Sequence, residues 1–410
     1  MPSSTEPKEK IVDRNEWGLN QLIAILDKIQ IVDVFNGKIN NFNKYIKELR
    51  ESIKSLRPAR IMVIGRSGSG KSSLINAICG LKVAEISDTK PKTGKTEWQA
   101  FYRNGVELVQ ILDTRGFQES KPPEEKDSAK TPTDSIIRAI DKECPDVILI
   151  VSKATDIRSG IHEDIDVCET VITRIKEKYS VDIPIVPVLN KCDELAPPRI
   201  QFPTTNKRKN DNLDEQVATF WGYLQIRGKL QNSLKDVRGV TPTVSYAEYQ
   251  DGENGLIISD EDFRWNIDKL IDVMMQCTPK ERRGSIARMT YLKDSQIVIA
   301  RGLIDTCCVL SGTATFLIPI PGSSLITGNI IQSFMVSYIA WLGGHIFSDK
   351  DEAIADFIAT AAAVGVTDIF VSLIPGVGQV ISAGTNAIAT KAIGEAAIQH
   401  FIVAKSAPNN

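Results

Sequence analysis

A glycine-rich octapeptide, Gly65-Arg-Ser-Gly-Ser-Gly-Lys-Ser72, follows the apolar run Ile61–Ile64 and continues into a helical run. Its spacing is G-x-x-x-x-G-K-[ST], in which the glycines let successive backbone N–H groups point at phosphate oxygens. The N-terminus of the following helix adds a partial positive charge at the same place. This order of strand, tight loop and helix predicts a phosphate-binding loop, with a chance glycine-rich turn as the alternative. The residues expected to bind are Gly65, Arg66, Ser67, Gly68, Ser69, Gly70, Lys71, Ser72 and Ser73.

Two side chains of this loop have defined tasks in such a site. The Lys71 ammonium is expected to bridge the β- and γ-phosphates of a nucleotide, and the Ser72 hydroxyl is expected to bind Mg²⁺. The octapeptide therefore predicts a nucleotide and Mg²⁺ as ligands.

A second motif, Asp113-Thr-Arg-Gly116, closes the predicted strand Val106–Asp113 about forty residues after Lys71. An aspartate at that strand end can hold Mg²⁺, usually through water. The backbone N–H of Gly116 can approach a γ-phosphate, because a side chain there would obstruct it. We therefore predict Asp113 as a further metal-binding residue and Gly116 as a contact of the terminal phosphate.

A third motif, Asn190-Lys-Cys-Asp193, closes the apolar run Ile183–Asn190 and has the form N-K-x-D. The Asp193 carboxylate can accept hydrogen bonds from both N1–H and the exocyclic amine of guanine. Adenine lacks that donor pair and would leave a buried carboxylate unpaired, which is costly. Asn190 is expected to tie this segment to the phosphate-binding loop, and the Lys191 stem to cover the base. The motif predicts GTP and GDP rather than ATP; a solvated polar loop is the alternative.

In this order, the three motifs resemble those of a TRAFAC-class GTPase of the Era-like group, over the middle half of the chain. The resemblance implies a switch I threonine that caps Mg²⁺ and senses the γ-phosphate; Thr93 fits that place best, and Thr96 is its rival. It also implies a last guanine contact from a loop after the final strand, where Ser245 and Tyr246 stand. Tyr246 departs from the family pattern, which has a small residue there.

The resemblance further implies hydrolysis of GTP to GDP and phosphate, with Lys71, Thr93 and Gly116 as the catalytic residues. Phe117 stands where Ras-like members carry a water-orienting glutamine, and a phenyl ring cannot orient water. We therefore expect a low intrinsic rate that depends on Mg²⁺ and on the electrostatics of the phosphate-binding loop. Arg115 is a candidate arginine finger, although an ordinary surface residue of the switch is the plainer interpretation.

Short β-rich runs alternate with helical runs through the middle of the chain. This alternation predicts an α/β fold with a mostly parallel sheet and helices on both faces. The predicted strands are Arg60–Gly65, Thr96–Tyr102, Val106–Asp113, Asp146–Ser152, Ile183–Asn190 and Thr241–Ser245. The predicted helices are Lys71–Cys79, Thr133–Lys142, Glu163–Lys178 and Asn212–Lys235.

Two segments that interrupt this alternation, Gln118–Pro132 and Ala196–Asn212, are predicted to be mobile surface loops. The second contains the basic cluster Lys207-Arg-Lys209. This cluster could contact an acidic partner, but a solvated loop is the preferred interpretation.

Changes of composition predict the domains. Residues 1–10 are polar and charged, and we expect a disordered tail without a secretory signal. Apolar residues at helical spacing predict a helical hairpin within residues 11–57. An Era-like GTPase domain is expected over residues 58–280, and a hydrophobic helical domain over residues 281–405. The N-terminal and C-terminal helices are expected to form one all-α domain together.

The C-terminal region contains two long stretches without any charged side chain, Thr306–Phe347 and Ile369–Thr390. Within it, Phe316-Leu-Ile-Pro-Ile-Pro-Gly322 is similar to Phe370-Val-Ser-Leu-Ile-Pro-Gly376, which predicts two helix–Pro-Gly–helix repeats. This arrangement resembles the hydrophobic helical domain behind many bacterial Era-like GTPase domains. It resembles the immunity-related and dynamin-like GTPases more loosely.

Two interpretations of this region stay open. The charge-free run Gly322–Leu342 approaches the ~20 residues that span hydrocarbon, which favours membrane association. Many of its positions are small or polar, and Asp305, Asp356 and Asp368 would be costly in lipid. A soluble four-helix bundle is the alternative.

The overall composition narrows the function classes. Lys plus Arg total 49 and Asp plus Glu total 51, so the net charge of -2 argues against a general binder of nucleic acid. Seven cysteines form no C-x-x-C pair, and three histidines leave little room for a zinc site or a histidine-based catalyst. Reduced thiols indicate a cytoplasmic protein, with membrane association as the open question.

Together these patterns favour a slowly hydrolysing GTP switch that acts at a lipid membrane surface or through a homodimer of the GTPase domain. Two alternatives stay open. One is a soluble GTPase in ribosome or RNA assembly, against which the near-neutral charge counts. The other is a nucleotide-gated interaction module with negligible turnover, which Phe117 favours.

Overall fold

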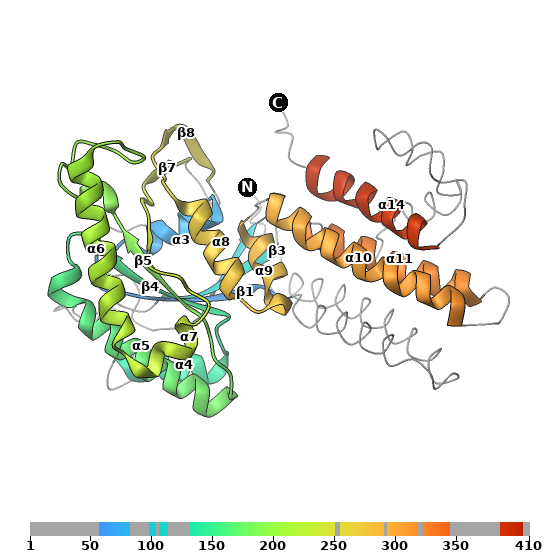
Figure 1. The fold of residues 1–410 in the computed structure, drawn as a ribbon, viewed down its shortest axis with the longest axis horizontal. Coiled ribbons are helices and arrows are strands. Elements are labelled where there is room, and N and C mark those ends of the chain that lie inside the picture. Colours follow the sequence, from blue (N-terminus) through green and yellow to red (C-terminus); the bar gives the residue numbers. More distant parts are fainter. Residues whose placement is uncertain are drawn as a thin grey trace, which may run out of the picture. The chain divides into compact units, whose positions relative to one another are not determined.

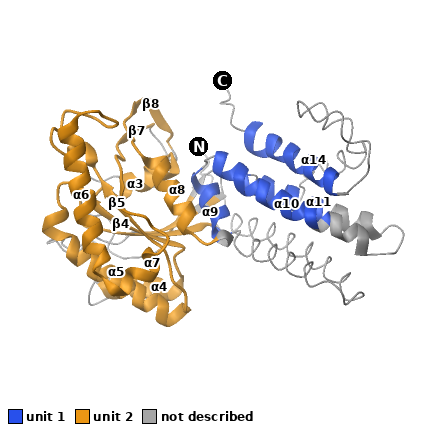
Figure 2. Cartoon of the chain, in the orientation of Figure 1, with its two compact units in different colours: residues 1–57, 104–106, 281–410 blue, residues 58–103, 107–280 orange. Residues whose placement is uncertain are grey.

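The computed structural model describes residues 57–82, 98–103, 106–113, 132–250, 255–290, 293–317, 323–344 and 386–404 (Figure 1). The chain divides into two compact units (Figure 2). Residues 58–103 and 107–280 form the sheet unit. Residues 1–57, 104–106 and 281–410 form the helical unit.

The sheet unit contains a six-stranded sheet with the strand order β2-β3-β1-β4-β5-β6. Its strands are β1 (Ala59–Ile64), β2 (Gln99–Arg103), β3 (Val106–Asp113), β4 (Val147–Lys153), β5 (Ile185–Asn190) and β6 (Thr241–Pro242). β1 pairs in parallel with β3 and β4, β4 with β5, and β5 with β6. The prediction of a mostly parallel sheet flanked by helices is confirmed.

The central strands are continuous apolar runs, because neighbouring elements cover both faces of a parallel sheet. β1 is buried at every position except Arg60, and β4 at every position except Lys153. In register, Ile61 lies opposite Ile111 of β3 and Val147 of β4. The carboxyl ends of these parallel strands therefore meet at one edge of the sheet, which is where such folds bind ligands.

The helices of the sheet unit form two groups of neighbours. They are α3 (Lys71–Cys79), α4 (Pro132–Lys142), α5 (Ile157–Tyr179), α6 (Lys207–Gln225), α7 (Gln231–Leu234) and α8 (Ile267–Cys277). α5 contacts α4, α6 and β4, whereas α3 contacts α8. α5 begins six residues before the predicted start, since Ile157 and Ile161 extend its buried stripe toward the N-terminus at a spacing of four.

The prediction that Ala196–Asn212 is a mobile surface loop is wrong for its last six residues. α6 begins at Lys207, and the Asn206 side chain caps it by accepting from the backbone N–H of Lys209. The Lys209 side chain is fully buried, so the cluster that contains it is not a freely solvated basic surface. α6 also ends earlier than predicted, at Gln225, and the 3-10 turn Gly228–Leu230 separates it from α7.

A small antiparallel hairpin of β7 (Ala247–Tyr249) and β8 (Ile257–Asp262) follows β6, and the sequence patterns did not predict it. β6 itself is shorter than predicted. The pairing with β5 ends at Pro242, although the N–H of Thr243 still donates to the Leu189 carbonyl oxygen at 2.8 Å. Val244 then forms an isolated antiparallel bridge with Trp265.

The described part of the helical unit consists of helices that pack on one another. They are α9 (Lys280–Thr290), α10 (Lys293–Leu317), α11 (Ser323–Leu342) and α14 (Asn386–Ile398), followed by the π-helical turn Gln399–Val403. α10, α11 and α14 contact each other pairwise. Gly394 on α14 allows a close approach, because a Cβ there would lie 2.4 Å from Cγ1 of Ile304.

Both predicted Pro-Gly turns, at Pro321-Gly322 and Pro375-Gly376, lie outside the described residues, as do the N-terminal hairpin and the loop Gln118–Thr131. The two helix–Pro-Gly–helix repeats therefore stay a prediction. Among the helices that are described, none combines the length and the apolar character that crossing a membrane requires.

Candidate functional site

The phosphate-binding loop predicted from the octapeptide runs from the end of β1 into the start of α3. Gly68 and Gly70 have φ values of 81° and 83°, in the left-handed region that favours glycine. A Cβ on Gly70 would lie 2.5 Å from Nδ2 of Asn190. Gly65 is equally constrained, since a Cβ there would lie 2.2 Å from the Val151 carbonyl oxygen. The curl of the loop therefore requires glycine at positions 68 and 70, and the elements packed against the loop require it at positions 65 and 70.

Lys71 is the first residue of α3, and its side chain turns back over the loop. Its Nζ donates to the carbonyl oxygens of Gly65 at 3.0 Å and Arg66 at 3.2 Å. The ammonium is thus held at the N-terminus of α3, where the helix dipole also favours anions. Ser72 and Ser73 follow in the same first turn and are half-buried. This arrangement concentrates positive charge where phosphate oxygens would lie.

The third motif is joined directly to this loop. Nδ2 of the fully buried Asn190 donates to the carbonyl oxygens of Ser69 at 3.0 Å and Gly70 at 3.3 Å. Thr243 donates from its hydroxyl to Oδ1 of Asn190 at 3.2 Å and so fixes the orientation of the amide. The backbone N–H of Cys192 donates to the Thr243 carbonyl oxygen at 3.1 Å. The ends of β5 and β6 therefore form one hydrogen-bonded unit with the phosphate-binding loop.

The rest of the motif follows in the 3-10 turn Cys192–Glu194. Lys191 has a φ of 58°, and its stem passes close to the loop, because a Cβ on Gly70 would lie 3.3 Å from Cε of Lys191. Asp193 is half-buried, and its carbonyl oxygen accepts from Nζ of Lys209 at 2.8 Å. Lys209 also donates to the Pro197 carbonyl oxygen at 3.2 Å. Lys209, which the sequence patterns suggested was solvated, thus holds the backbone of the turn that carries Asp193.

Ser245 and Tyr246 lie in the segment after β6. Ser245 is buried, whereas Tyr246 is 52% exposed. The Tyr246 ring stacks on Phe263 with 5.6 Å between ring centroids, and its hydroxyl donates to Oε1 of Glu248 at 2.7 Å. Tyr246 is therefore an aromatic surface held in place by two contacts rather than a freely rotating side chain.

Asp113 is the last residue of β3 and pairs in register with Val63 of β1. Its backbone therefore lies next to the strand that leads into the phosphate-binding loop. Thr93 and its rival Thr96 lie outside the described residues, as do Arg115, Gly116 and Phe117. Their predicted roles stay predictions.

Residues 60–191 match a family model described as 50S ribosome-binding GTPase. The matched segment contains the octapeptide, the Asp113–Gly116 motif and the first two residues of the third motif. This part of the chain is an Era-like P-loop GTPase domain.

Two curated relatives match the same domain. The chain is 31% identical to GTPase Era of Alkaliphilus oremlandii over 135 residues, which are 33% of this chain and 40% of that protein. It is 33% identical to the tRNA modification GTPase MnmE of Mycoplasma genitalium over 118 residues, 28% of this chain and 26% of the relative. The match thus spans less than half the length of either relative.

Among solved structures, Toc33 of Arabidopsis thaliana in complex with GDP and Mg²⁺ overlaps 58% of this chain and 93% of its own. The identity is 16% and the TM-score 0.35.

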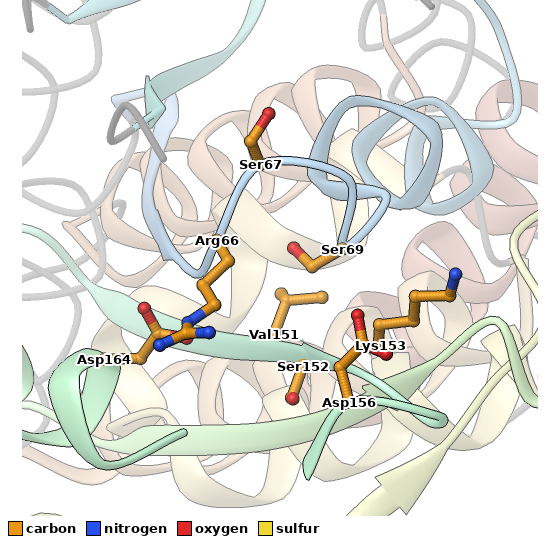
Figure 3. A pocket seen from close by; sticks show the side chains of 8 residues that line it. All are labelled: Arg66, Ser67, Ser69, Val151, Ser152, Lys153, Asp156 and Asp164. Carbon is orange, nitrogen blue, oxygen red and sulfur yellow. The ribbon is translucent and has the colours of Figure 1, made fainter. Parts of the chain in front are cut away.

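The GTPase domain has a polar cavity that the sequence patterns did not suggest. Its volume is about 260 Å³. It lies between the phosphate-binding loop Gly65–Ser72 (the P-loop), the end of β4 and the start of α5 (Figure 3). The lining residues are Arg66, Ser67, Ser69, Val151, Ser152, Lys153, Asp156 and Asp164. Asp164 is 1% exposed, although it is a carboxylate. A sequence clue exists, because Asp164 falls on the otherwise apolar stripe formed by Ile157, Ile161 and Cys168.

Arg66 links the P-loop to α5 at this cavity. Its guanidinium donates to the Ser159 carbonyl oxygen at 3.4 Å and to Oε2 of Glu163 at 3.1 Å. It lies across Gly160, where a Cβ would come within 1.5 Å of Cζ of Arg66. Gly160 in the first turns of α5 is therefore explained by the arginine that crosses it.

Proposed function

We propose that this protein binds GTP and GDP with Mg²⁺ and hydrolyses GTP to GDP and phosphate at a low intrinsic rate. The observation that carries the proposal is the bond from Asn190 to the carbonyl oxygens of Ser69 and Gly70. It joins a loop suited to phosphate to a turn suited to guanine. A guanine nucleotide is the ligand that uses both.

In the phosphate half, Lys71 supplies a positive charge, and Ser72 and Asp113 would hold Mg²⁺. A hydroxyl and a carboxylate are hard oxygen donors that suit Mg²⁺, which takes further ligands from phosphate and water. Within the part of the chain that the structure describes, no group of three or more His, Cys, Asp or Glu could hold a metal. This sparse donor set fits an ion shared with phosphate. When bound, Mg²⁺ would neutralise the charge that develops on the phosphates.

Thr93 and Gly116 complete the proposed site at the terminal phosphate. Thr93 would cap Mg²⁺, and the Gly116 N–H would contact the γ-phosphate. Thr93→Ala is expected to leave the affinity for GDP nearly unchanged and to weaken a non-hydrolysable GTP analogue, because only the latter carries a γ-phosphate. Equal loss for both nucleotides would contradict this role, and Thr96→Ala is the matched control.

In the base half, Asp193 would accept from guanine, and Lys191, Ser245 and Tyr246 would line the base. The test is Asp193→Asn, which replaces one acceptor by a donor. Xanthine carries an oxygen where guanine carries its amine, so the variant is expected to lose GDP by roughly 10³-fold and to gain xanthosine diphosphate. Glu194→Gln, next in the chain, is the matched control and should keep the preference for GDP. A variant at Asp193 that still prefers GDP would exclude the proposed base contact.

The intrinsic rate follows from what the site can supply. With Phe117 in place of a water-orienting glutamine, Mg²⁺ and the P-loop are left to stabilise the transition state. A multiple-turnover phosphate-release assay is expected to give a rate on the order of 10⁻³ per second. No turnover above that of Lys71→Ala would favour the nucleotide-gated module instead. A rate near 1 per second would mean that a water-positioning group is present in the chain.

We further propose that the nucleotide state is passed on at a membrane surface or through a homodimer of the GTPase domain. The charge-free stretches of the helical unit support the first route. Flotation with liposomes in GDP and in a non-hydrolysable GTP analogue tests it, and light scattering of the same samples tests the second. A protein that neither floats nor dimerises in either nucleotide would leave protein partners as the output.

Ribosome or RNA assembly is the second candidate function. The description of the matched family model and the name of the MnmE relative favour it. The net charge of -2 counts against it. Nucleotide-dependent co-sedimentation with ribosomal subunits would support this candidate, and its absence at low salt would exclude it.

A further inference from the structure

The cavity beside the P-loop contains polar atoms that lack partners among the described residues. They are Nε of Arg66, Oγ of Ser69 and Oδ1 of Asp164. All three belong to residues that line the same cavity (Figure 3). A buried carboxylate oxygen without a donor is costly in its ionised form. The ionised form of the Asp164 carboxyl group is therefore electrostatically unfavourable at this position.

Asp164 also contacts the backbone of the P-loop. The backbone N–H of Arg66 is a favourable partner for its carboxylate and lowers the pKa of Asp164. The carbonyl oxygen of the same residue accepts from Nζ of Lys71 at 3.2 Å. One residue of the loop thus connects the buried carboxylate to the ammonium that would meet phosphate.

The charges around Asp164 set how readily it ionises. Burial raises its pKa to about 6, and the cations Arg66 and Lys71 oppose that rise. The charged and titratable groups that face it or line the same cavity are Arg66, Lys71, Lys153, Asp156, Glu163 and Cys168. Arg66 is shared with Glu163 at 3.1 Å, and Lys153 pairs with Glu194 at 2.7 Å. Lys71 is the cation near Asp164 whose ammonium group a bound phosphate would contact.

We propose that Asp164 is a positioning residue of the phosphate site whose carboxyl group takes up a proton when phosphate binds beside Lys71. Phosphate adds negative charge and offsets the positive charge of Lys71, which otherwise stabilises the carboxylate. The ionised form of Asp164 then loses stabilisation while it stays buried, so the protonated form is favoured. This inference rests on the proposed nucleotide binding. It adds that Asp164 takes up a proton when the nucleotide binds.

The sign of the effect follows from linkage. A group that binds its proton more tightly in the complex makes the affinity rise as the pH falls. If the pKa of Asp164 rises from about 6 to about 7 on binding, GDP would bind roughly fivefold more tightly at pH 6 than at pH 8 through this group alone. At pH 7 the same change corresponds to roughly 0.4 of a proton.

The test is calorimetry of GDP with Mg²⁺ on the full chain, at pH 7 in two buffers with different ionisation enthalpies. Because the nucleotide phosphates titrate too, Asp164→Asn is the reference: it keeps an acceptor for the Arg66 N–H but cannot take up the proton. Wild type is expected to take up roughly 0.4 of a proton more than this variant. Asp166→Asn is the matched control, since Asp166 lies on the same helix in an exposed ion pair with Arg227, and should behave as wild type.

Affinity separates the positioning role from the proton. Asp164→Asn, which mimics the protonated form, is expected to bind GDP up to about tenfold more tightly than wild type at pH 8 and about equally near pH 5. Asp164→Ala, which also removes the acceptor, should bind about tenfold more weakly than Asp164→Asn. Equal proton uptake in wild type and Asp164→Asn would overturn the proposal while nucleotide binding stands. Failure of wild type to bind GDP would overturn the proposed function and this inference together. If Asp164→Asn does not fold, an infrared difference spectrum of wild type decides, because GDP must then produce a protonated-carboxyl band near pH 7.

Discussion

In the sheet unit, the buried side chains of Asn190 and Lys209 donate to backbone carbonyl groups of loops at the carboxyl edge of the sheet. In the helical unit, the buried hydroxyl of Thr390 on α14 donates to Oγ of Ser311 on α10 at 3.0 Å. It also accepts from Gln332 on α11 at 3.2 Å. The first set fixes the shape of loops that a ligand can contact, and the second fixes helices against each other. The contrast indicates that buried polar groups support ligand binding in the sheet unit and helix packing in the helical unit.

Among variants of these buried contacts, the greatest loss of binding is expected for Asn190→Ala in the sheet unit. It removes the donor to two P-loop carbonyl oxygens and leaves the hydroxyl of Thr243 with the longer bond to the Leu189 carbonyl oxygen at 3.5 Å. We expect a loss of about 3 kcal/mol, or about 100-fold in GDP affinity, by calorimetry. Thr390→Val in the helical unit is the matched control and should leave GDP affinity unchanged. An equal effect of both variants on GDP would remove the distinction between the two units.

Gly394→Ala tests the helical unit in the opposite direction. The new Cβ would lie 2.4 Å from Cγ1 of Ile304 and 3.1 Å from the Met335 sulfur, so overpacking should destabilise this unit by about 2 kcal/mol. Hydrogen exchange of peptides from α10 and α14 would rise, while GDP affinity stays within about twofold. Gly302→Ala, on an open face of α10, should instead stabilise by up to about 1 kcal/mol. Slower exchange in Gly394→Ala would show that α10 and α14 do not pack this closely.

The effect of Lys209→Met on GDP affinity should lie between those of Asn190→Ala and Gly394→Ala. This variant removes a structural contact that supports the turn carrying Asp193. The Asp193 and Pro197 carbonyl oxygens lose their charged donor, and we expect GDP to bind about tenfold more weakly. Burial lowers the pKa of Lys209, so part of the lost bonding is offset by no longer burying a charge. Lys207→Met, at an exposed position two residues earlier, should bind GDP as wild type does. Unchanged binding in Lys209→Met would mean that the Asp193 turn holds its shape without this lysine.

A change of similar size to that of Lys209→Met is expected in the pH-dependent stability of Asp164→Asn. Burial raises the folded pKa of Asp164 to about 6, above its ordinary value of 3.8. The wild-type carboxyl therefore favours the fold below pH 4 and costs stability as the pH rises through 6. The asparagine variant should be more stable than wild type by about 1 to 2 kcal/mol above pH 6 and show no such gain near pH 4. Urea unfolding at the two pH values measures this, and a gain that is the same at both would assign the effect to packing rather than charge.

The sheet, the curl of the P-loop and the link through Asn190 could be predicted because each depends on local rules. β-branched runs predicted the central strands, and the glycine spacing of the P-loop predicted a curl that φ values of 81° and 83° now describe. The prediction that Asn190 ties two loops together is also confirmed by its bonds to Ser69 and Gly70. In these cases the sequence pattern and the contact involve the same few residues.

The contacts that sequence patterns missed are long-range. Lys209 looked solvated because its neighbours are basic, yet the carbonyl oxygens that accept from it come from a turn 12 and 16 residues away. Arg66 lies over Gly160, more than ninety residues later, so neither residue alone indicates a link between the P-loop and α5. The early start of α5 was missed for the same reason, because Gly160 weakens a helix unless its missing side chain is explained.

Calorimetry of the purified full chain with GDP and with ADP, each with Mg²⁺, decides whether this site selects a guanine nucleotide. We expect GDP to bind and ADP to bind at least about 10³-fold more weakly, because Asp193 would be left without its donor pair. Comparable affinities for the two nucleotides, or no binding of GDP, would contradict the proposed site.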